Sequence, residues 1–204
     1  MALNIAVMAS TRGTDMQAVI DAIESGDLKD INLALVLTNK ECGAAEKARK
    51  HNLKLVILGS KGMEREEYDK KVIELMKENN IDLILFIGWM RLITPLFVKT
   101  FENKIMNIHP SLLPAFAGGM DLNVHEEILK RGCKVTGCTL HFVDEGADTG
   151  PIIMQKVVKV KDDDTPDTLK ERVQKAEEEA IIEALKLYRG GRIKVRGNKV
   201  RILG

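Results

Sequence analysis

The most constraining feature of this sequence is an alternation, within its first 90 residues, between short apolar runs and longer segments of helical periodicity. The apolar runs are nearly continuous, which is typical of strands buried on both faces of a sheet. The segments between them are rich in helix formers and long enough to connect parallel strands. The predicted strands cover residues 3–9, 31–38, 53–59 and 82–89, and the predicted helices cover residues 14–26, 42–52 and 63–80. This pattern predicts an α/β fold with a doubly wound, Rossmann-like, mainly parallel sheet.

The second half of the chain predicts antiparallel additions to this sheet. Further strand-like runs cover residues 104–109, 134–143 and 151–160, and a glycine-rich loop and a short helix separate the first two. A strong helix follows over residues 165–191, with Thr165 suited to the N-cap, Pro166 to the first helical position and Gly190 to the end. The last residues alternate apolar and basic side chains around a Gly-Asn pair, which predicts a β-hairpin with a solvated basic face.

Composition limits the classes of function. A chain of 204 residues with 45% apolar residues can form one core, so we expect a single domain over residues 1–204. The net charge of +1 favours neither nucleic acid nor a membrane surface. The three cysteines include no Cys-x-x-Cys pair, which argues against a disulfide framework and a structural zinc site. No apolar run is long enough to cross a membrane. We therefore expect a cytoplasmic protein, monomeric or homodimeric, that acts on small molecules.

The stretch "KIMNIHPSLLP" places polar side chains at the end of an apolar strand. Side chains alternate along a strand, so Asn107 and His109 share one face. Pro110 then ends the strand, and ligands of open α/β sheets bind just beyond the carboxyl ends of the strands. The pair is a candidate catalytic site, although an isolated histidine in such a place is more often a satisfied core residue.

A carboxylate partner for His109 is available in "HFVDEGADTGP", a tight loop that follows another strand. The loop carries Asp144, Glu145 and Asp148, and the residues alone leave open which of them turns inward. A nearby carboxylate raises the pKa of an imidazole. We therefore expect His109 to stay protonated near neutral pH, where it would be a useful general acid.

Two further stretches suggest binding. In "ASTRGTDMQ" a strand leads through Gly13 into a helix, whose first N–H groups at Gly13, Thr14 and Asp15 could hold a phosphate. A plain turn capped by Thr14 or Asp15 is equally compatible with this stretch. In "GWMRLITP" Trp89 and Met90 either line a flat pocket or complete the core.

The motifs "RGTDMQ", "GWMRLITP", "NIHPSLLP" and "HFVDEGADTGPI", in this order, resemble those of the formyltransferases that use 10-formyltetrahydrofolate. Within that family the resemblance is greatest to the branch that formylates glycinamide ribonucleotide in purine biosynthesis, and it covers nearly the whole chain. It implies transfer of the formyl group to the amine of that nucleotide without a metal. The length leaves no room for the C-terminal RNA-binding domain of methionyl-tRNA formyltransferases or the N-terminal regulatory domain of formyltetrahydrofolate deformylases.

The resemblance also implies roles for particular residues. It implies that Asn107, His109 and Asp148 are the catalytic residues. Residues 1–100 would form the nucleotide- and phosphate-binding half, and residues 101–204 the catalytic and folate-binding half. The residues implied to bind the ribonucleotide are Gly13, Thr14, Asp15, Gln174 and Glu177, and those implied to bind folate are Arg65, Met90, Arg91, Leu92, Ile93, Val143 and Asp144.

The sequence departs from the family pattern in two loops. After "HPSLLP", Ala117 stands where proline is common, Asp121 lies where another polar residue is usual, and His125 corresponds to a retained histidine. "RGTD" replaces the more usual Gly-Asn-Gly-Ser-Asn type of phosphate loop. Other acceptors, either water (a deformylase) or an amino-sugar nucleotide, therefore stay open as alternatives. Further alternatives are a metal site made by His109, His141 and Asp148, and a nucleotide-binding module without catalysis.

Overall fold

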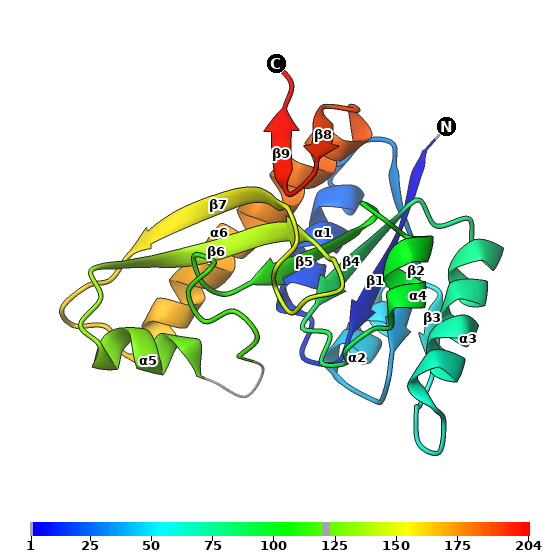
Figure 1. Ribbon diagram of the computed structural model, residues 1–204, viewed down its shortest axis with the longest axis horizontal. Helices are drawn as coiled ribbons and strands as arrows, with labels where there is room; N and C mark the ends of the chain where they lie inside the picture. The colour runs from blue at the N-terminus through cyan, green and yellow to red at the C-terminus, as the bar shows by residue number, and fades with distance from the viewer. Residues whose placement is uncertain (1, 120–122) are drawn as a thin grey trace.

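The computed structural model describes residues 2–119 and 123–204, and it confirms the predicted α/β class (Figure 1). The elements follow one another in the expected alternation. In chain order they are β1 (Leu3–Ala9), α1 (Thr14–Glu24), β2 (Ile31–Thr38), α2 (Gly43–Lys50), β3 (Leu55–Ile57), α3 (Arg65–Glu78), β4 (Leu83–Ile87), α4 (Pro95–Thr100), β5 (Ile105–His109), α5 (Val124–Lys130), β6 (Val135–Phe142), β7 (Ile152–Lys159), α6 (Pro166–Arg189), β8 (Ile193–Arg196) and β9 (Lys199–Ile202).

A seven-stranded sheet with the order β3-β2-β1-β4-β5-β6-β7 runs through both halves of the chain. Strands β1 to β5 pair in parallel, whereas β6 and β7 add in antiparallel fashion, as predicted. The strand order reverses between β1 and β4, which creates a crevice beyond their carboxyl ends. The end of β5 lies one strand away from this crevice, so the polar pair predicted there stands beside it.

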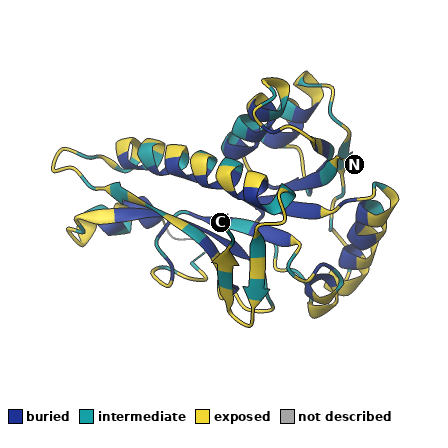
Figure 2. Ribbon diagram, turned by 90° about the horizontal axis from the view of Figure 1, so that it is seen from above, coloured by how far each residue is buried: buried dark blue, intermediate teal, exposed yellow. Residues whose placement is uncertain are grey.

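Helices cover both faces of the sheet and form two hydrophobic cores. The core on one face joins the sheet to α1, α2, α5 and α6, and the core on the other face joins it to α3 and α4. The long helix α6 runs along one side of the sheet, with buried strands in the centre and exposed residues on the outer turns of the helices (Figure 2). Successive residues of β5 point into different cores. Ile108 packs in the core with α1, α2, α5 and α6, and Ile105 packs in the core with α3 and α4.

Some local predictions were confirmed and others were incomplete. The Thr165 side chain accepts a hydrogen bond from the backbone of Thr168, so the predicted N-cap of α6 is present. Strand β3 is shorter than the run over 53–59 suggested, and the short helix α4 was not predicted. Trp89 is only 8% exposed and packs near Phe86, so it completes the core, whereas Met90 is exposed. Among the described residues, no helix has the length and apolar character to cross a membrane.

Candidate active site

The candidate site is built at the carboxyl end of β5, where a central parallel strand meets the antiparallel strand β6. Asn107 lies opposite His141 across this pair, and His109 lies opposite Thr139. The side chains of Asn107 and His109 point to the same side of the sheet as Ile105, as the pleat predicts. Both polar groups therefore reach the loop that leaves β6.

Asp148 is the carboxylate of that loop that turns inward. Its Oδ1 accepts a hydrogen bond from the Asn107 amide at 3.3 Å, and its Oδ2 lies 3.4 Å from Nδ1 of His109 and accepts from the backbone N–H of Gly118 at 2.9 Å. The contact with His141 and the hydrogen bond from Gly118, together with the charge interaction with His109, lower the pKa of Asp148 to about 2 despite partial burial. Asp144 instead accepts hydrogen bonds within its own loop, and Glu145 is exposed. The choice that the residues alone left open thus falls on Asp148.

His109 presents one ring nitrogen without a partner. The residue is 7% exposed, and its buried Nε2 has no hydrogen bond among the described residues. Burial lowers the pKa of His109 below its ordinary value, and this outweighs the opposite effect of Asp148. The expectation that His109 is protonated near neutral pH was therefore wrong: the cost of burying an imidazolium exceeds the attraction of a carboxylate 3.4 Å away.

His141 is a neighbour whose contact with the pair the sequence did not predict. Its Nδ1 lies 2.8 Å from the carbonyl oxygen of Phe142, to which it donates, and its Nε2 lies 3.1 Å from the amide nitrogen of Asn107. Nε2 also lies 3.5 Å from Oδ1 of Asp148, so His141 contacts both the amide and the carboxylate. Within the described ranges, no group of three histidine, cysteine or acidic residues is arranged to hold a metal ion. The structure therefore lends no support to the alternative of a metal site at His109, His141 and Asp148.

The chain that follows His109 is fixed by the next two strands. Thr139 on β6 donates its hydroxyl to the carbonyl oxygen of Ser111 and accepts from the backbone N–H of Leu113. Gln155 on β7 donates to the carbonyl oxygen of Leu113 and to the hydroxyl of Thr139. Strands β6 and β7 thus hold the start of the loop after β5 in place, and this fixes the position of His109 at the end of β5.

Gly150 controls the position of the Asp148 loop, because an added Cβ would lie 1.9 Å from the carbonyl oxygen of Phe142. We expect Gly150→Ala to displace the loop, to lower the free energy of unfolding by about 1–3 kcal/mol and to lower kcat. Urea unfolding and a transfer assay measure the two effects. Gly59→Ala is the matched control, since nothing lies within 4 Å of its added Cβ. Equal stability and activity of the two variants would contradict this role of Gly150.

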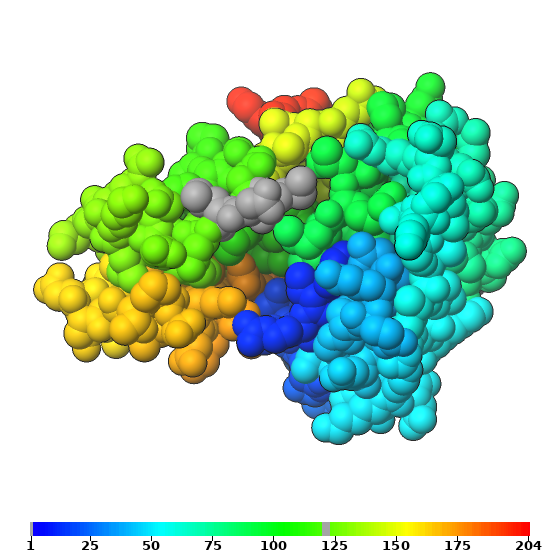
Figure 3. Space-filling view, turned by 90° about the horizontal axis from the view of Figure 1, so that it is seen from below, coloured from blue at the N-terminus to red at the C-terminus, as the bar shows by residue number. Residues whose placement is uncertain are grey.

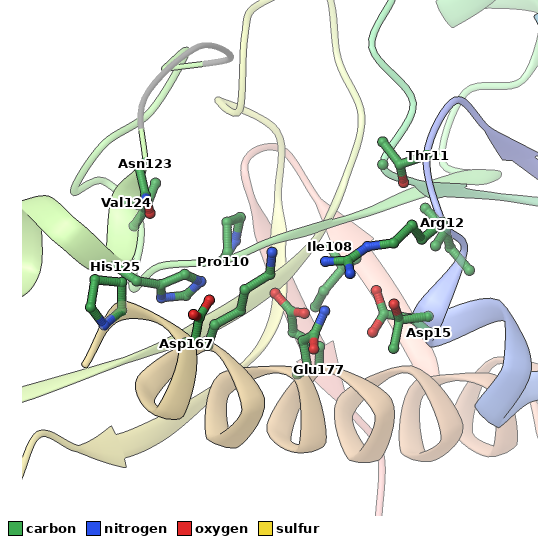
Figure 4. A pocket seen from close by; sticks show the side chains of 16 residues that line it. Thr11, Arg12, Asp15, Ile108, Pro110, Asn123, Val124, His125, Asp167 and Glu177 are labelled. Atoms are coloured by element: carbon green, nitrogen blue, oxygen red, sulfur yellow. The ribbon is translucent and has the colours of Figure 1, made fainter. Parts of the chain in front are cut away.

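A cavity of about 530 Å³ opens on the α1 and α6 side of the same sheet end. Figure 3 shows the hollow between the residues that lead into α1, the start of α6 and the middle of the chain. In Figure 4, Arg12 and Asp15 lie at one end of the cavity, and His125 and Asp167 lie toward the other. Its lining residues are Thr11, Arg12, Thr14, Asp15, Ile87, Gly88, Ile108, Pro110, Asn123, Val124, His125, Pro166, Asp167, Lys170, Gln174 and Glu177.

The cavity brings together the residues that were expected to bind a ribonucleotide. Thr14, Asp15, Gln174 and Glu177 line it, and Gly13, the residue just before α1, lies between two lining residues. Neither Thr14 nor Asp15 caps α1, because no side chain caps this helix. The alternative of a plain capped turn therefore has no support, and the first N–H groups of α1 stay available to an anion.

Two cationic residues of the cavity, Arg12 and Lys170, were not predicted. Lys170 lies four residues before Gln174 and seven before Glu177, so the helical period places all three on one face of α6. Testing the neighbours of Gln174 at this spacing would have found Lys170. Arg12 directly precedes Gly13, within a stretch that had already been singled out, and could have been found there.

Charge inside the cavity is set by burial. Burial, reinforced by the ammonium of Lys170, lowers the pKa of His125 to about 4, so this imidazole is neutral, and its Nδ1 is buried without a partner. Burial and the charge of Glu178 raise the pKa of Asp15 to about 7. Burial and the charge of Asp15 raise the pKa of Glu177 as well. Asp121, the other predicted polar residue of the preceding loop, lies outside the described residues.

The residues expected to bind folate come from three segments: Met90, Arg91, Leu92 and Ile93 follow β4, Val143 and Asp144 follow β6, and Arg65 lies at the start of α3. The Arg91 guanidinium lies 4.2 Å from the centroid of the Tyr68 ring and donates to the Ser60 hydroxyl. Met90 and Leu92 are 45% and 50% exposed, whereas Ile93 and Val143 pack against the core. Arg65 begins α3 and is exposed, and none of the contacts described for this part of the chain joins it to the others.

Three comparisons bear on the family of the chain. The sequence profile described as formyl transferase matches residues 3–185. The trifunctional purine biosynthetic protein adenosine-3 of Gallus gallus is 39% identical over 195 residues, which cover 95% of this chain and 19% of that protein. This chain thus spans about a fifth of the length of that relative.

Solved structures share the whole fold. Glycinamide ribonucleotide transformylase 1 from Symbiobacterium toebii superposes with a TM-score of 0.93 at 35% identity, covering 100% of this chain and 95% of that one. A formyltetrahydrofolate deformylase from Pseudomonas syringae has a TM-score of 0.89 at 23% identity, covering 100% of this chain and 67% of that one. The second likeness concerns the fold alone.

Proposed function

This chain belongs to the formyl transferase family, and we propose that it transfers the formyl group of 10-formyltetrahydrofolate to the amine of glycinamide ribonucleotide in purine biosynthesis. Relatives named for this reaction or for purine biosynthesis support the acceptor. Their match covers residues on both sides of the candidate site. Formyl-tetrahydrofolate is in general the co-substrate of this family.

The single observation that carries the proposal is the unpaired Nε2 of His109 at the end of β5. The cavity with its phosphate-binding features opens on the α1 and α6 side of this strand end, and the exposed apolar loop around Met90 lies on the α3 and α4 side. Two substrates that approach from opposite faces of the sheet meet beside this nitrogen. We assign the nucleotide to the cavity and the folate to the loop at Met90.

The proposed reaction begins when the neutral amine of the acceptor attacks the formyl carbon, which forms a C–N bond and places negative charge on the formyl oxygen. Nε2 of His109, unprotonated because of burial, accepts the proton that the amine loses. Asp148, ionised, stabilises the imidazolium that forms. His109 then delivers the proton to N10 of the folate as the C–N10 bond breaks, and tetrahydrofolate and the formylated amine leave.

The side-chain amide of Asn107 donates to Asp148, and its nitrogen lies 3.1 Å from Nε2 of His141. We propose that one hydrogen of this amide turns to the formyl oxygen as charge develops there, because an amide donor aimed at an oxyanion stabilises the transition state. The ring of His141, fixed by its contact with the carbonyl oxygen of Phe142, lies beside the amide and holds it in the orientation that makes this possible. No covalent bond to the protein forms at any step.

The pH dependence of kcat tests the resting state of His109. With both substrates saturating, we expect kcat to fall as the pH drops through a value below 6.5, because His109 accepts a proton only when neutral and burial lowers its pKa. Above that value His109 is already neutral, so its titration no longer changes kcat. A stopped-flow or steady-state profile from pH 5 to 8 measures this. A rise in kcat on acidification through the same range would show instead that the imidazolium is the active form.

The acceptor itself is tested by product analysis. The protein is incubated with 10-formyltetrahydrofolate and either glycinamide ribonucleotide, an amino-sugar nucleotide or no amine, and formylated product and free formate are quantified. The proposal predicts rapid formylation of glycinamide ribonucleotide only. Formate release that does not depend on an amine would instead favour the deformylase reading.

A further inference from the structure

Asp15 and Glu177 form a buried pair of carboxyl groups in the cavity. They are 8% and 6% exposed, and Figure 4 shows them, from α1 and α6, facing the same part of the cavity. Oδ1 of Asp15 is buried without a hydrogen-bond partner among the described residues. Within the same ranges, no described hydrogen bond or ion pair compensates the carboxyl group of Glu177. Two carboxyl groups this deeply buried, one of them with an oxygen that lacks a partner, are costly if both are ionised.

The neighbouring charges do not neutralise the pair. The acidic Glu178 faces Asp15 from α6, and its charge disfavours ionisation of Asp15. The ammonium of Lys170 faces Glu177 but lowers its pKa less than burial and the two acidic neighbours raise it. The titratable and charged groups around the pair are Arg12 before α1, His125 on α5, Cys138 on β6, and Lys170 and Glu178 on α6.

The position of Asp15 conflicts with the binding of an anion unless its charge is suppressed. Asp15 is the second residue of α1, at the helix end that would hold the phosphate of the acceptor. An ionised carboxylate there would repel a phosphate, whereas a protonated one can donate a hydrogen bond to it. Two carboxyl groups that share a site hold one proton far more strongly than an isolated group does.

We propose that Asp15 and Glu177 hold one proton between them while the phosphate of the acceptor is bound, and that loss of this proton releases the acceptor. The inference rests on the proposed function, because it takes the phosphate end of the acceptor to lie at the start of α1. It makes Asp15 a binding residue whose affinity for the acceptor depends on pH. The affinity for folate should not depend on the protonation of this pair.

Calorimetric titration of glycinamide ribonucleotide into the intact protein and into Asp15→Asn, without folate, tests the inference from pH 6.5 to 8.5. Because burial raises the pKa values of both carboxyl groups and the proton belongs to the pair, the Kd of the unaltered protein should rise severalfold relative to that of the variant across this range. The variant controls for titration of the ligand, since both proteins meet the same ligand charge. Titration at pH 8 in buffers of different ionisation enthalpy should show uptake of a proton by the unaltered protein that Asp15→Asn lacks.

Two further variants keep the test decisive. Glu177→Gln should flatten the pH dependence as Asp15→Asn does, because removing either carboxyl group removes the shared proton. Glu179→Gln is the matched control, because it removes one exposed carboxylate from the same helix and should follow the unaltered protein. A constant ratio of Kd between the unaltered protein and both pair variants across the pH range would overturn the inference.

The same experiments distinguish the inference from the proposed function. If glycinamide ribonucleotide binds but the pH dependence of its Kd is the same in all variants, the shared proton is refuted and the proposed acceptor is not. If glycinamide ribonucleotide neither binds at pH 6.5 nor is formylated in the complete assay, the proposed acceptor is refuted, and the inference with it.

Discussion

Replacement of His109 by alanine is expected to lower kcat roughly 10²- to 10⁴-fold, the usual range for loss of a general acid or base. The physical reason is that Nε2 of His109 is a buried nitrogen without a hydrogen-bond partner among the described residues, at the strand end where we propose that the two substrates meet. The KM values should change far less than kcat, since the cavity residues to which we assign the acceptor are untouched. Steady-state transfer from 10-formyltetrahydrofolate to glycinamide ribonucleotide measures the effect.

The matched control is His51→Ala. His51 ends α2 and contacts Glu24 and Gln17, away from β5. It reports the general cost of deleting an imidazole, and its kcat should stay near that of the unaltered protein. Circular dichroism shows whether both variants fold. A folded His109→Ala protein with near-native turnover would refute the assignment of His109 to proton transfer.

The second large effect is expected for Asp148→Asn, with a fall in kcat of roughly 10²- to 10⁴-fold. The carboxylate faces Nδ1 of His109, and an amide there removes the charge that stabilises the imidazolium and can favour the wrong tautomer. Because the side chain keeps its size and one oxygen, the hydrogen bond from Gly118 can persist and the loop should keep its shape. The loss should therefore fall on kcat rather than on folding.

Glu145→Gln is the control for this variant, because Glu145 is an exposed carboxylate of the same loop. Its kcat should change by no more than about fivefold, since ion pairs of exposed charges contribute about 0–1 kcal/mol. The pH profile gives a second readout: without Asp148, which raises the pKa of His109, the acid limb of kcat should move to lower pH. Equal losses in Asp148→Asn and Glu145→Gln would contradict a specific role for Asp148.

Periodicity predicted the sheet well because buried parallel strands leave a strong signal. Continuous apolar runs identified β1, β2 and β4, and the switch to antiparallel strands followed from short connections. The short helix α4 was missed since its six residues are too few to show a helical period. The pairing of Asn107 with His109 followed from the alternation of side chains alone.

The electrostatics of the site could not be predicted from the sequence. The spacing of residues indicated that a carboxylate could lie near His109, but only the depth of burial decides whether the imidazole is charged. In the same way, Asp15 and Glu177 are more than 160 residues apart in the chain, and only the packing of α1 against α6 brings their carboxyl groups together. Burial and long-range contact are properties of the folded chain, so a local pattern does not contain them.

The most direct test of the account follows the formyl carbon itself. The protein is mixed in a single turnover with 10-formyltetrahydrofolate labelled in the formyl group and with glycinamide ribonucleotide, and the label is traced by mass spectrometry. We expect the label to appear in N-formylglycinamide ribonucleotide, tetrahydrofolate to form in equal amount, and His109→Ala to slow the formation of both to the same extent. Label recovered as free formate, at a rate that the nucleotide does not change, would contradict the account.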